Sequence, residues 1–274
     1  MNSVVEQMMG FYTDEHIDDS QKLREVMQKI ALAGLYRGGF FSKAAFCGGT
    51  CLRLFHGLPR FSENMDFSLL EVNENFQIED YFPSIIREFQ ALDIEVSLKR
   101  KEKSKEPAIE SAFLKNDTSQ FDIDISRVLK IKLEVDTQPP PGFLTESKVS
   151  LLPFSFMVRC YEIPYLYAEK MHALMYRSWR NRVKGRDWFD FEWYVRNNAS
   201  LDFNHYKERV SQLSPQSEIP ESIDEFKAGL RNRIDSIDYS LAKRDVAPFI
   251  ADQSVLDIWS AEYFRELVEL IRFQ

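Results

Sequence analysis

The chain has 274 residues, of which 44% are hydrophobic and 28% are charged, so it is long enough to bury a sizeable core. Its formal net charge of −8 excludes a general electrostatic attraction to nucleic acid, so any such contact requires a local basic patch. No stretch approaches the roughly 20 apolar residues that span a bilayer, and the first residues lack a secretory signal pattern. We therefore expect a cytoplasmic protein that has no contact with membranes.

The hydrophobic pattern predicts mixed helices and strands up to about residue 198 and helices beyond it. In chain order we expect a helix over Gln21–Tyr36, a strand ending at Gly48, a helix capped by Thr50 that stops at Gly57, a strand over 61–70, a helix over Tyr81–Leu92, strands over 94–103, 111–117, 121–125, 128–136 and Phe156–Cys160, and helices over Pro164–Ser178, Arg186–Val195, Phe203–Val210, Ile223–Ile234 and Val255–Ile271. This order predicts an α/β (α+β) fold with a mixed sheet in residues 1–198 and a helical domain in residues 199–274.

Two adjacent glycines, Gly48 and Gly49, stand between an expected strand and an expected helix. Glycine lets backbone N–H groups approach a ligand closely, and a helix N-terminus attracts anions, so this turn is typical of a phosphate cradle. An ordinary turn would have the same pattern. In the next expected strand, Asn64 and Asp66 share a polar face with Ser62. Two such oxygen donors can hold Mg²⁺ against a phosphate bound at the turn.

The segment GGTCLRLFHGLPRFSENMDFSLL resembles the signature of the AbiEii/AbiGii-type nucleotidyltransferase toxins, which belong to the nucleotidyltransferase superfamily. In that signature a GG-T-x-L-R-L turn and helix precede R-x-S-x-D-[LI]-D-F. The residues that match it are Gly48, Gly49, Thr50, Leu52, Arg53, Leu54, Arg60, Ser62, Asp66 and Phe67. The resemblance implies a nucleotidyltransferase-like mixed sheet in which Gly48, Gly49 and Thr50 hold a triphosphate, with Arg60 and Ser62 also binding the nucleotide.

The chain departs from this signature at Asn64, where the family has the first of two aspartates. An asparagine amide oxygen can still ligate Mg²⁺, but it removes one negative charge from the site. We therefore expect weaker metal binding, or loss of activity.

Metal-dependent nucleotidyl transfer calls for a further carboxylate on a neighbouring strand. In KIKLEVD, the side chains of Lys132, Glu134 and Asp136 share one face, although a half-exposed strand without a function would show the same alternation. The family resemblance extends to a K-x-[ED] motif, which Lys132 and Glu134 match. Asp122 and Asp124 in FDIDI form a rival acidic pair, which is less favoured because no glycine turn precedes it.

The segment AEKMHALMYR followed by RDWFD resembles the family's A-E-K-x-x-A-x-x-x-R helix and R-D-x-x-D motif. At about 100° per residue, Lys170 and Arg177 fall inside the apolar arc of the expected helix. A cation on a core-facing stripe requires an anion. The bound triphosphate and an ion pair with Asp187 or Asp190 both satisfy this requirement, and both can hold in one protein.

The leading hypothesis is a nucleotidyltransferase that depends on Mg²⁺ or Mn²⁺ and transfers NMP from an NTP to an RNA, such as tRNA, or to a protein. The metal ligands would be Asn64, Asp66 and Glu134; the catalytic residues Asp66, Glu134, Lys170 and Asp187; and the nucleotide-binding residues Gly48, Gly49, Thr50, Arg60, Ser62, Lys132, Arg177 and Asp190. The resemblance implies a bacterial toxin of a toxin–antitoxin or abortive infection system, with a cognate antitoxin protein. Two alternatives stay open: a catalytically impaired member that binds nucleotide or a partner protein, and a helical interaction module attached to a decayed catalytic domain.

Overall fold

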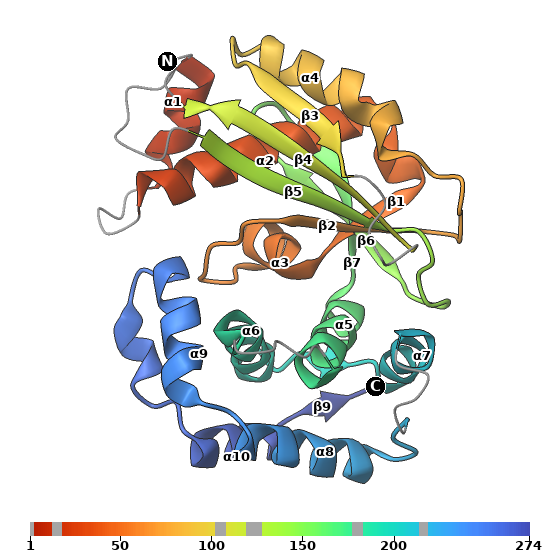
Figure 1. Ribbon diagram of the computed structural model, residues 1–274, viewed down its shortest axis with the longest axis vertical. Helices are drawn as coiled ribbons and strands as arrows, with labels where there is room; N and C mark the ends of the chain where they lie inside the picture. Colours follow the sequence, from red (N-terminus) through yellow and green to blue (C-terminus); the bar gives the residue numbers. More distant parts are fainter. Residues whose placement is uncertain (1–2, 13–17, 102–107, 119–127, 177–182, 214–218) are drawn as a thin grey trace. The chain divides into compact units, whose positions relative to one another are not determined.

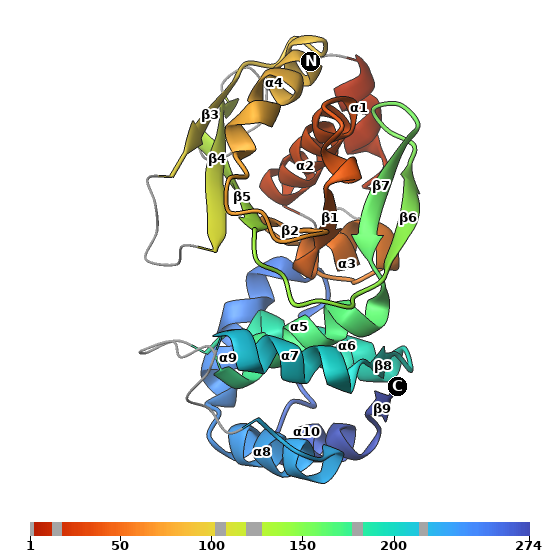
Figure 2. The same ribbon diagram turned by 90° about the vertical axis from the view of Figure 1, so that its right-hand side faces the viewer.

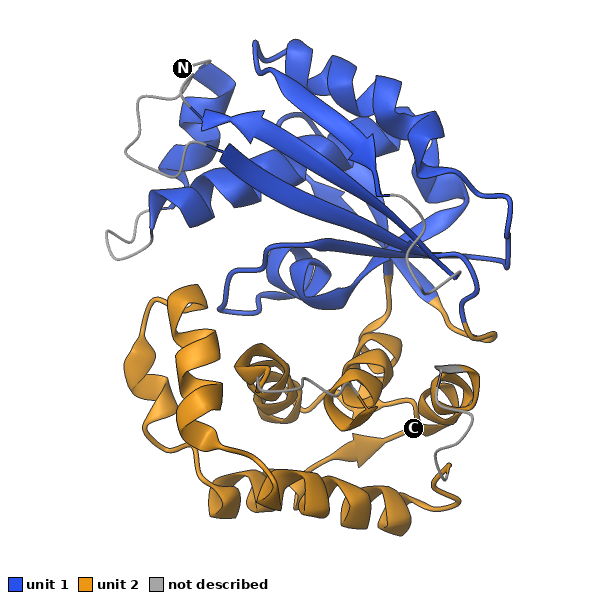
Figure 3. Cartoon of the chain, in the orientation of Figure 1, with its two compact units in different colours: residues 1–139, 145–160 blue, residues 140–144, 161–274 orange. Residues whose placement is uncertain are grey.

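The computed structural model describes residues 3–12, 18–101, 108–118, 128–176, 183–213 and 219–274. The chain forms two compact units (Figure 3): unit 1 comprises residues 1–139 and 145–160, and unit 2 comprises residues 140–144 and 161–274. The units separate after Cys160, whereas the sequence suggested a domain boundary after residue 198. The two helices that follow Cys160 therefore belong to unit 2.

Unit 1 is built on a seven-stranded mixed sheet with the strand order β3-β4-β5-β2-β1-β7-β6 (Figure 1). The strands are β1 (Ala44–Cys47), β2 (Met65–Leu69), β3 (Val96–Arg100), β4 (Ile109–Asp117), β5 (Val128–Asp136), β6 (Thr145–Ser150) and β7 (Phe156–Tyr161). Strand β2 runs parallel to β5 and antiparallel to β1, and β1 runs parallel to β7. The mixed sheet confirms the expected fold class.

Helices of unit 1 pack against this sheet. The helices of this unit are α1 (Ser3–Gly10), α2 (Asp19–Arg37), α3 (Gly48–His56) and α4 (Phe82–Gln90), with short 3₁₀ turns η1 (Phe40–Ser42) and η2 (Ile78–Tyr81). Figure 2 shows α2 and α4 on the same side of β3, β4 and β5. They pack closely because Gly34 has no side chain: a Cβ there would lie 2.6 Å from the Cα of Ile85. The β5 residues Ile131, Leu133 and Val135 are buried on the sheet's apolar face, as the alternation predicted.

Unit 2 is helical, with one two-stranded ribbon. Its elements are α5 (Ile163–Tyr176), α6 (Gly185–Arg196), β8 (Ser200–Leu201), α7 (Phe203–Leu213), α8 (Ile223–Asp235), α9 (Tyr239–Val246), η4 (Ala247–Phe249), η5 (Gln253–Leu256), α10 (Ala261–Glu269) and β9 (Arg272–Phe273). The indole of Trp259 and the hydroxyl of Tyr263 each donate a 2.7 Å hydrogen bond to Glu192, which ties α6 to the end of the chain.

Several elements differ from the expectations. The expected helix over Val255–Ile271 is divided, because the hydroxyl of Ser260 accepts a hydrogen bond from the N–H of Tyr263 and starts α10 anew. The alternation did not indicate β6 or α9. In the part of the chain that the structure describes, no helix has the length and apolar character needed to cross a membrane.

Candidate active site

The site of unit 1 begins at the double glycine, where β1 ends and α3 begins. Gly48 has a φ of +72°, a conformation that side chains rarely adopt, and a Cβ there would lie 2.5 Å from Oδ2 of Asp66. A Cβ on Gly49 would lie 2.5 Å from Nη2 of Arg60 and 3.4 Å from Oγ of Ser62. The two glycines therefore bring the first turn of α3 against Asp66 on one side and Arg60 on the other.

Thr50 was expected to cap α3, and this expectation is wrong. The helix begins at Gly48 and its N-cap is Cys47, so Thr50 lies in the first turn. Its side chain is fully buried, and its hydroxyl donates a hydrogen bond to the backbone carbonyl of Asn64. Thr50 thus holds the chain just before β2 against α3.

Asp66 and Glu134 lie directly opposite each other in the parallel pair β2–β5. Opposite residues of paired strands project to the same face, and paired strands are about 4.8 Å apart, so the two carboxylates are neighbours. The register continues across the sheet, because Cys47 pairs with Asp66 and Ser111 pairs with Glu134. Nζ of Lys132 lies 2.5 Å from Oε1 of Glu134, so the K-x-E motif forms an ion pair beside the two carboxylates.

Ser62 and Asn64 do not extend β2, contrary to the expected strand over 61–70. Their carbonyl groups accept hydrogen bonds from side chains instead of from a neighbouring strand: Gln28 donates to Ser62 at 2.9 Å, and Thr50 donates to Asn64. Asn64 is exposed at the residue before β2.

The two carboxylates suit a hard divalent cation. Carboxylate oxygens are the ligands that Mg²⁺ and Mn²⁺ prefer, and both Asp66 and Glu134 are partly exposed. The missing Cβ of Gly48 leaves space against Oδ2 of Asp66. Among the described residues, no group of three or more His, Cys, Asp or Glu side chains could hold a metal ion. A metal held here would therefore need other oxygen donors, such as Asn64 or a bound phosphate.

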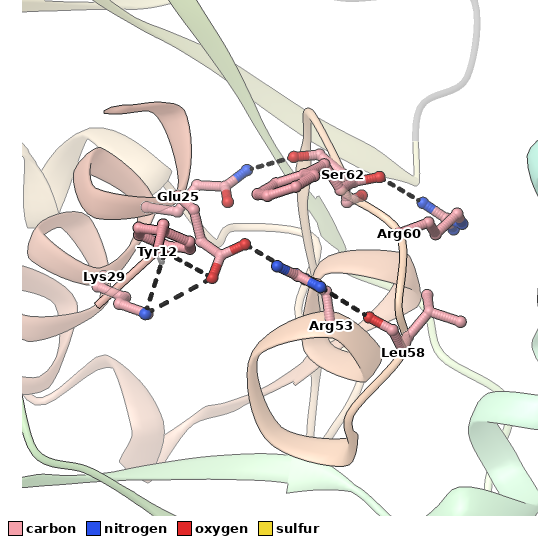
Figure 4. A network of polar contacts seen from close by, with 9 residues as sticks. Tyr12, Glu25, Lys29, Arg53, Leu58, Arg60 and Ser62 are labelled. Atoms are coloured by element: carbon pink, nitrogen blue, oxygen red, sulfur yellow. Dashed lines mark hydrogen bonds and ion pairs between the residues drawn. The ribbon is translucent and has the colours of Figure 1, made fainter. Parts of the chain in front are cut away.

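A polar network supports the segment that carries Arg60 and Ser62 (Figure 4). At its centre is Glu25 of α2, which is only 6% exposed. Glu25 accepts a 2.9 Å hydrogen bond from Nε of Arg53 and a 2.7 Å hydrogen bond from the hydroxyl of Tyr12. Burial and the Glu25 carboxylate raise the pKa of Tyr12 well above its usual value. The same network includes Lys29, whose Nζ lies 3.6 Å from Glu25.

Arg53 connects this network to the segment that carries Arg60 and Ser62. Its Nη1 donates a 3.2 Å hydrogen bond to the carbonyl of Leu58, and its guanidinium lies 4.2 Å from the ring centroid of Phe61. Arg60 is itself only 3% exposed and donates a 2.9 Å hydrogen bond to the carbonyl of Phe61. The sequence indicated Arg53 as part of the signature but did not indicate its partner Glu25, which lies 28 residues earlier.

A second polar cluster lies within unit 2, between α5 and α6. Nζ of Lys170 lies 2.6 Å from Oδ1 of Asp187 and 2.8 Å from Oδ2 of Asp190, whose side chain is fully buried. The expected ion pair of Lys170 with these aspartates is therefore confirmed. Arg177 lies outside the described residues, and so do Asp122 and Asp124 of the rival acidic pair.

Glu169, the neighbour of Lys170, forms a cluster that the sequence did not indicate. It accepts a 2.7 Å hydrogen bond from Nε of Arg209 and lies 3.1 Å from Nε2 of His205. Burial alone would raise its pKa, but Arg209 and His205 outweigh burial and lower the pKa of Glu169 to about 2. This cluster fixes α5, which carries Lys170, to α7. Glu169 precedes Lys170 in the A-E-K motif, but the motif gave no indication that Arg209 and His205 would be its partners.

A sequence model described as the nucleotidyl transferase AbiEii toxin of type IV toxin–antitoxin systems matches residues 30–269 of the chain. The protein belongs to this family. A crystal structure of a protein from H. pylori titled as a nucleotidyltransferase is similar in fold, with a TM-score of 0.53, 17% identity, and coverage of 93% of this chain and 95% of that one. A second structure, JHP933 from Helicobacter pylori, has 16% identity and a TM-score of 0.48, and the match covers 92% of this chain and 95% of that one. No curated protein matches the chain in sequence.

Within this AbiEii family member, the structure brings most of the expected site residues together in two groups. Those of unit 1 are Gly48, Gly49, Thr50, Arg60, Ser62, Asp66, Lys132 and Glu134. Those of unit 2 are Lys170, Asp187 and Asp190. In unit 1 the shared face of Asp66 and Glu134, next to the glycine turn, is the arrangement from which a function can be inferred.

Proposed function

We propose that this AbiEii family member transfers NMP from an NTP to a hydroxyl group of an RNA acceptor, such as tRNA, in a reaction that depends on Mg²⁺ or Mn²⁺. The observation that carries this proposal is the pairing of Asp66 with Glu134 next to the turn at Gly48. A cradle for phosphates beside two carboxylates suits an in-line attack on the α-phosphorus, with pyrophosphate as the leaving group.

The residues have distinct roles in this proposal. The N–H groups of the first turn of α3, at Gly48 and Gly49, would bind the phosphates, with the positive charge of Arg60 beside them. Asp66, Glu134 and the amide oxygen of Asn64 would hold the metal, which when bound would polarise the α-phosphate and favour ionisation of the attacking hydroxyl.

Lys170, which belongs to unit 2, would bind phosphate, with Arg177, Asp187 and Asp190 in support. Lys170 is already bound to two aspartates, so their carboxylates fix its position while reducing the charge available to a phosphate. We therefore expect Lys170→Ala to weaken nucleotide binding without abolishing it. The measurement is the shift in melting temperature that NTP and Mg²⁺ produce, since a ligand that binds only the folded state stabilises it by mass action.

A second candidate function follows from Asn64. An asparagine at an exposed position next to only two paired carboxylates favours a protein that binds nucleotide, or a partner protein, with little or no catalysis. Under either function, family membership supports a cognate antitoxin as the partner. NTPs and RNA are cytoplasmic, and the proposal assigns the protein to that compartment.

The test is Mg²⁺-dependent incorporation of label from each of the four α-labelled NTPs into total RNA, and into the protein itself as an alternative acceptor. Asp66→Asn is the decisive variant, because it keeps the size of the side chain and removes its charge. Asp80→Asn, at an exposed position in η2, is the matched control. We expect incorporation into RNA by wild type and by the control, and none by Asp66→Asn or in EDTA.

Three results would decide against the leading function. Equal incorporation by Asp66→Asn would remove the carboxylate pair from the chemistry. The second function would be established if wild type bound NTP without incorporating label and Asn64→Asp gained incorporation. Label in the protein but not in RNA would replace RNA as the acceptor.

A further inference from the structure

One face of strands β3, β4 and β5 carries a cluster of lysines. Along β5, Leu129 and Ile131 are buried, whereas Lys130 is exposed and Lys132 is partly exposed. Helices α2 and α4 lie on one side of these strands (Figure 2), and the buried residues belong to that side. The lysines therefore project from the opposite side of the sheet.

The register brings lysines of three strands together on this side. Lys115 of β4 lies directly opposite Lys130 of β5, and Phe113 of β4 lies between Lys132 of β5 and Lys99 of β3. We call Lys99, Lys115, Lys130 and Lys132 the lysine face. Lys99, Lys115 and Lys130 are all exposed.

The lysine face is electrostatically unfavourable by itself. Like charges directly opposite each other on paired strands destabilise a sheet, and Lys115 and Lys130 are such a pair. No carboxylate of the described residues forms an ion pair with Lys99, Lys115 or Lys130, and Nζ of Lys130 instead lies 3.7 Å from the ring centroid of Phe113. Because the chain as a whole has a net charge of −8, this cluster does not reflect a generally basic surface. An anionic ligand would remove the repulsion.

The lysine face is continuous with the candidate active site. Lys130, Lys132 and Glu134 alternate along one face of β5, and Glu134 lies opposite Asp66. A chain of phosphates that follows these lysines would therefore lead to the carboxylate pair. Residues two apart on a strand are spaced by about 6.7 Å, so the lysines offer regularly placed charges rather than a single anion site.

We propose that the lysine face binds the phosphate backbone of a single-stranded segment of the RNA acceptor, next to the end that reacts. The proposal rests on the proposed function for its choice of RNA. Proteins that bind single strands combine a basic surface with an aromatic ring against which bases stack, and Phe113 supplies such a ring among the lysines. An acidic polypeptide would use the charges but would have no use for the ring.

The test is the binding of a fluorescein-labelled single-stranded RNA oligonucleotide to the full-length protein, followed by anisotropy at several KCl concentrations. The test variant is the double substitution Lys115→Gln/Lys130→Gln. The control is Lys43→Gln/Lys207→Gln, which removes the same charge. Lys43 is exposed like Lys115, and Lys207 lies over the ring of Phe203 as Lys130 lies over Phe113.

We expect the slope of log K against log salt to become shallower by about 1.4 in the test variant, because each lost phosphate contact contributes about 0.7 for a single strand. Between 50 and 200 mM salt, this change in slope alone alters the affinity ratio of wild type to test variant by about sevenfold, with the larger ratio at low salt. The control should bind RNA like wild type, and both variants should keep the wild-type melting shift with NTP and Mg²⁺.

Other outcomes separate this proposal from the proposed function. In one outcome, wild type binds RNA but transfers no NMP, and the test variant loses the RNA binding. This result would support RNA binding by the lysine face and refute the proposed transferase activity. In another outcome, wild type transfers NMP to RNA, and the test variant keeps the wild-type salt dependence of RNA binding and the wild-type KM for RNA. This result would overturn the proposed RNA binding by the lysine face. The proposal would also be overturned if poly-glutamate displaced the labelled RNA as effectively as unlabelled RNA of equal charge.

Discussion

Asp66 and Glu134 occupy one row of the sheet, opposite each other in the parallel strands β2 and β5. Their carboxylates therefore share a face at the point where the turn at Gly48 meets Asp66. Two neighbouring carboxylates repel one another unless a cation lies between them, and here the Nζ of Lys132 forms an ion pair with Glu134. This relationship makes the effect of an added charge at the site predictable.

Asn64→Asp should tighten Mg²⁺ binding. The substitution adds a charged oxygen ligand at the residue that precedes β2, and the affinity of such sites increases with the number of charged ligands. We expect the Mg²⁺ concentration at half-saturation to fall on the order of tenfold, with a gain in NMP transfer. Isothermal titration with Mg²⁺ in the presence of a non-hydrolysable NTP measures the change. Asn75→Asp adds the same charge at another exposed position and should have no effect.

Gly48→Ala should abolish nucleotide binding, whereas Gly39→Ala should not. Both glycines have positive φ angles, +72° and +74°, so both substitutions carry the same kind of backbone strain. A Cβ at position 48 would also lie 2.5 Å from Oδ2 of Asp66, but at position 39 it would meet no atom within 4 Å. The difference between the variants isolates the collision with Asp66.

The readout for the glycine pair is the melting shift produced by NTP and Mg²⁺, together with the unfolding free energy without ligand. Each variant should lose about 1 kcal/mol of stability from strain at a positive φ, with a larger loss for Gly48→Ala. Retention of the full nucleotide-dependent shift by Gly48→Ala would mean that the glycine turn does not contact the nucleotide.

Sequence periodicity predicted the faces of single strands well, because a side chain's face depends only on its position in the strand. The exposed lysines and buried aliphatic residues of β5 follow the expected alternation. Which strands pair, and in what register, depends on contacts between distant segments. For this reason the row that joins Asp66 to Glu134 was an expectation from family resemblance, and the opposition of Lys115 and Lys130 had no sequence signal.

Side-chain contacts over long sequence distances limited the prediction of the site itself. Ser62 and Asn64 fit a strand by alternation. Their carbonyl groups instead accept hydrogen bonds from the side chains of Gln28 and Thr50, and β2 begins only at Met65. A polar residue in a helix pattern does not identify its partner, so the hydrogen bond between Arg53 and Glu25 could not be predicted from the sequence either.

Glu25→Gln should destabilise the protein and weaken nucleotide binding together. The substitution removes the buried counter-charge of Arg53 and Lys29, and breaking one partner of such a network commonly costs several kcal/mol. Because Arg53 is partly exposed, we expect about 2 kcal/mol. Arg53 also binds the carbonyl of Leu58, so KM for NTP should rise more than kcat falls.

Urea denaturation and NTP titration of Glu25→Gln provide the two measurements. Glu269→Gln is the control, because Glu269 pairs with Arg231 and Lys227 on an exposed surface, where ion pairs contribute little. It should change stability by less than about 1 kcal/mol. A Glu25→Gln protein that is destabilised but has an unchanged KM would restrict the network to a structural role.

His56 should make the protein less stable as the pH falls from 6.5 to 4. Burial, with the nearby charge of Lys148, lowers the pKa of His56 from 6.5 to about 4, and Glu146 opposes this only in part. In this pH window the unfolded chain takes up a proton that the folded protein does not bind. The unfolding free energy therefore decreases as the pH falls, by about 2 kcal/mol over the window, and is fully retained above pH 6.5.

The contribution of His56 is measured as the difference in urea-unfolding free energy between wild type and His56→Gln at each pH, which cancels the titration of other groups. This difference should change steadily between pH 6.5 and pH 4 and should be constant above pH 6.5. Lys148→Gln supplies an independent check, because removing that charge should raise the pKa of His56 and narrow the window. An NMR titration that finds the ordinary pKa for His56 in the folded protein, or a pH-independent difference, would show that its burial does not hold it neutral.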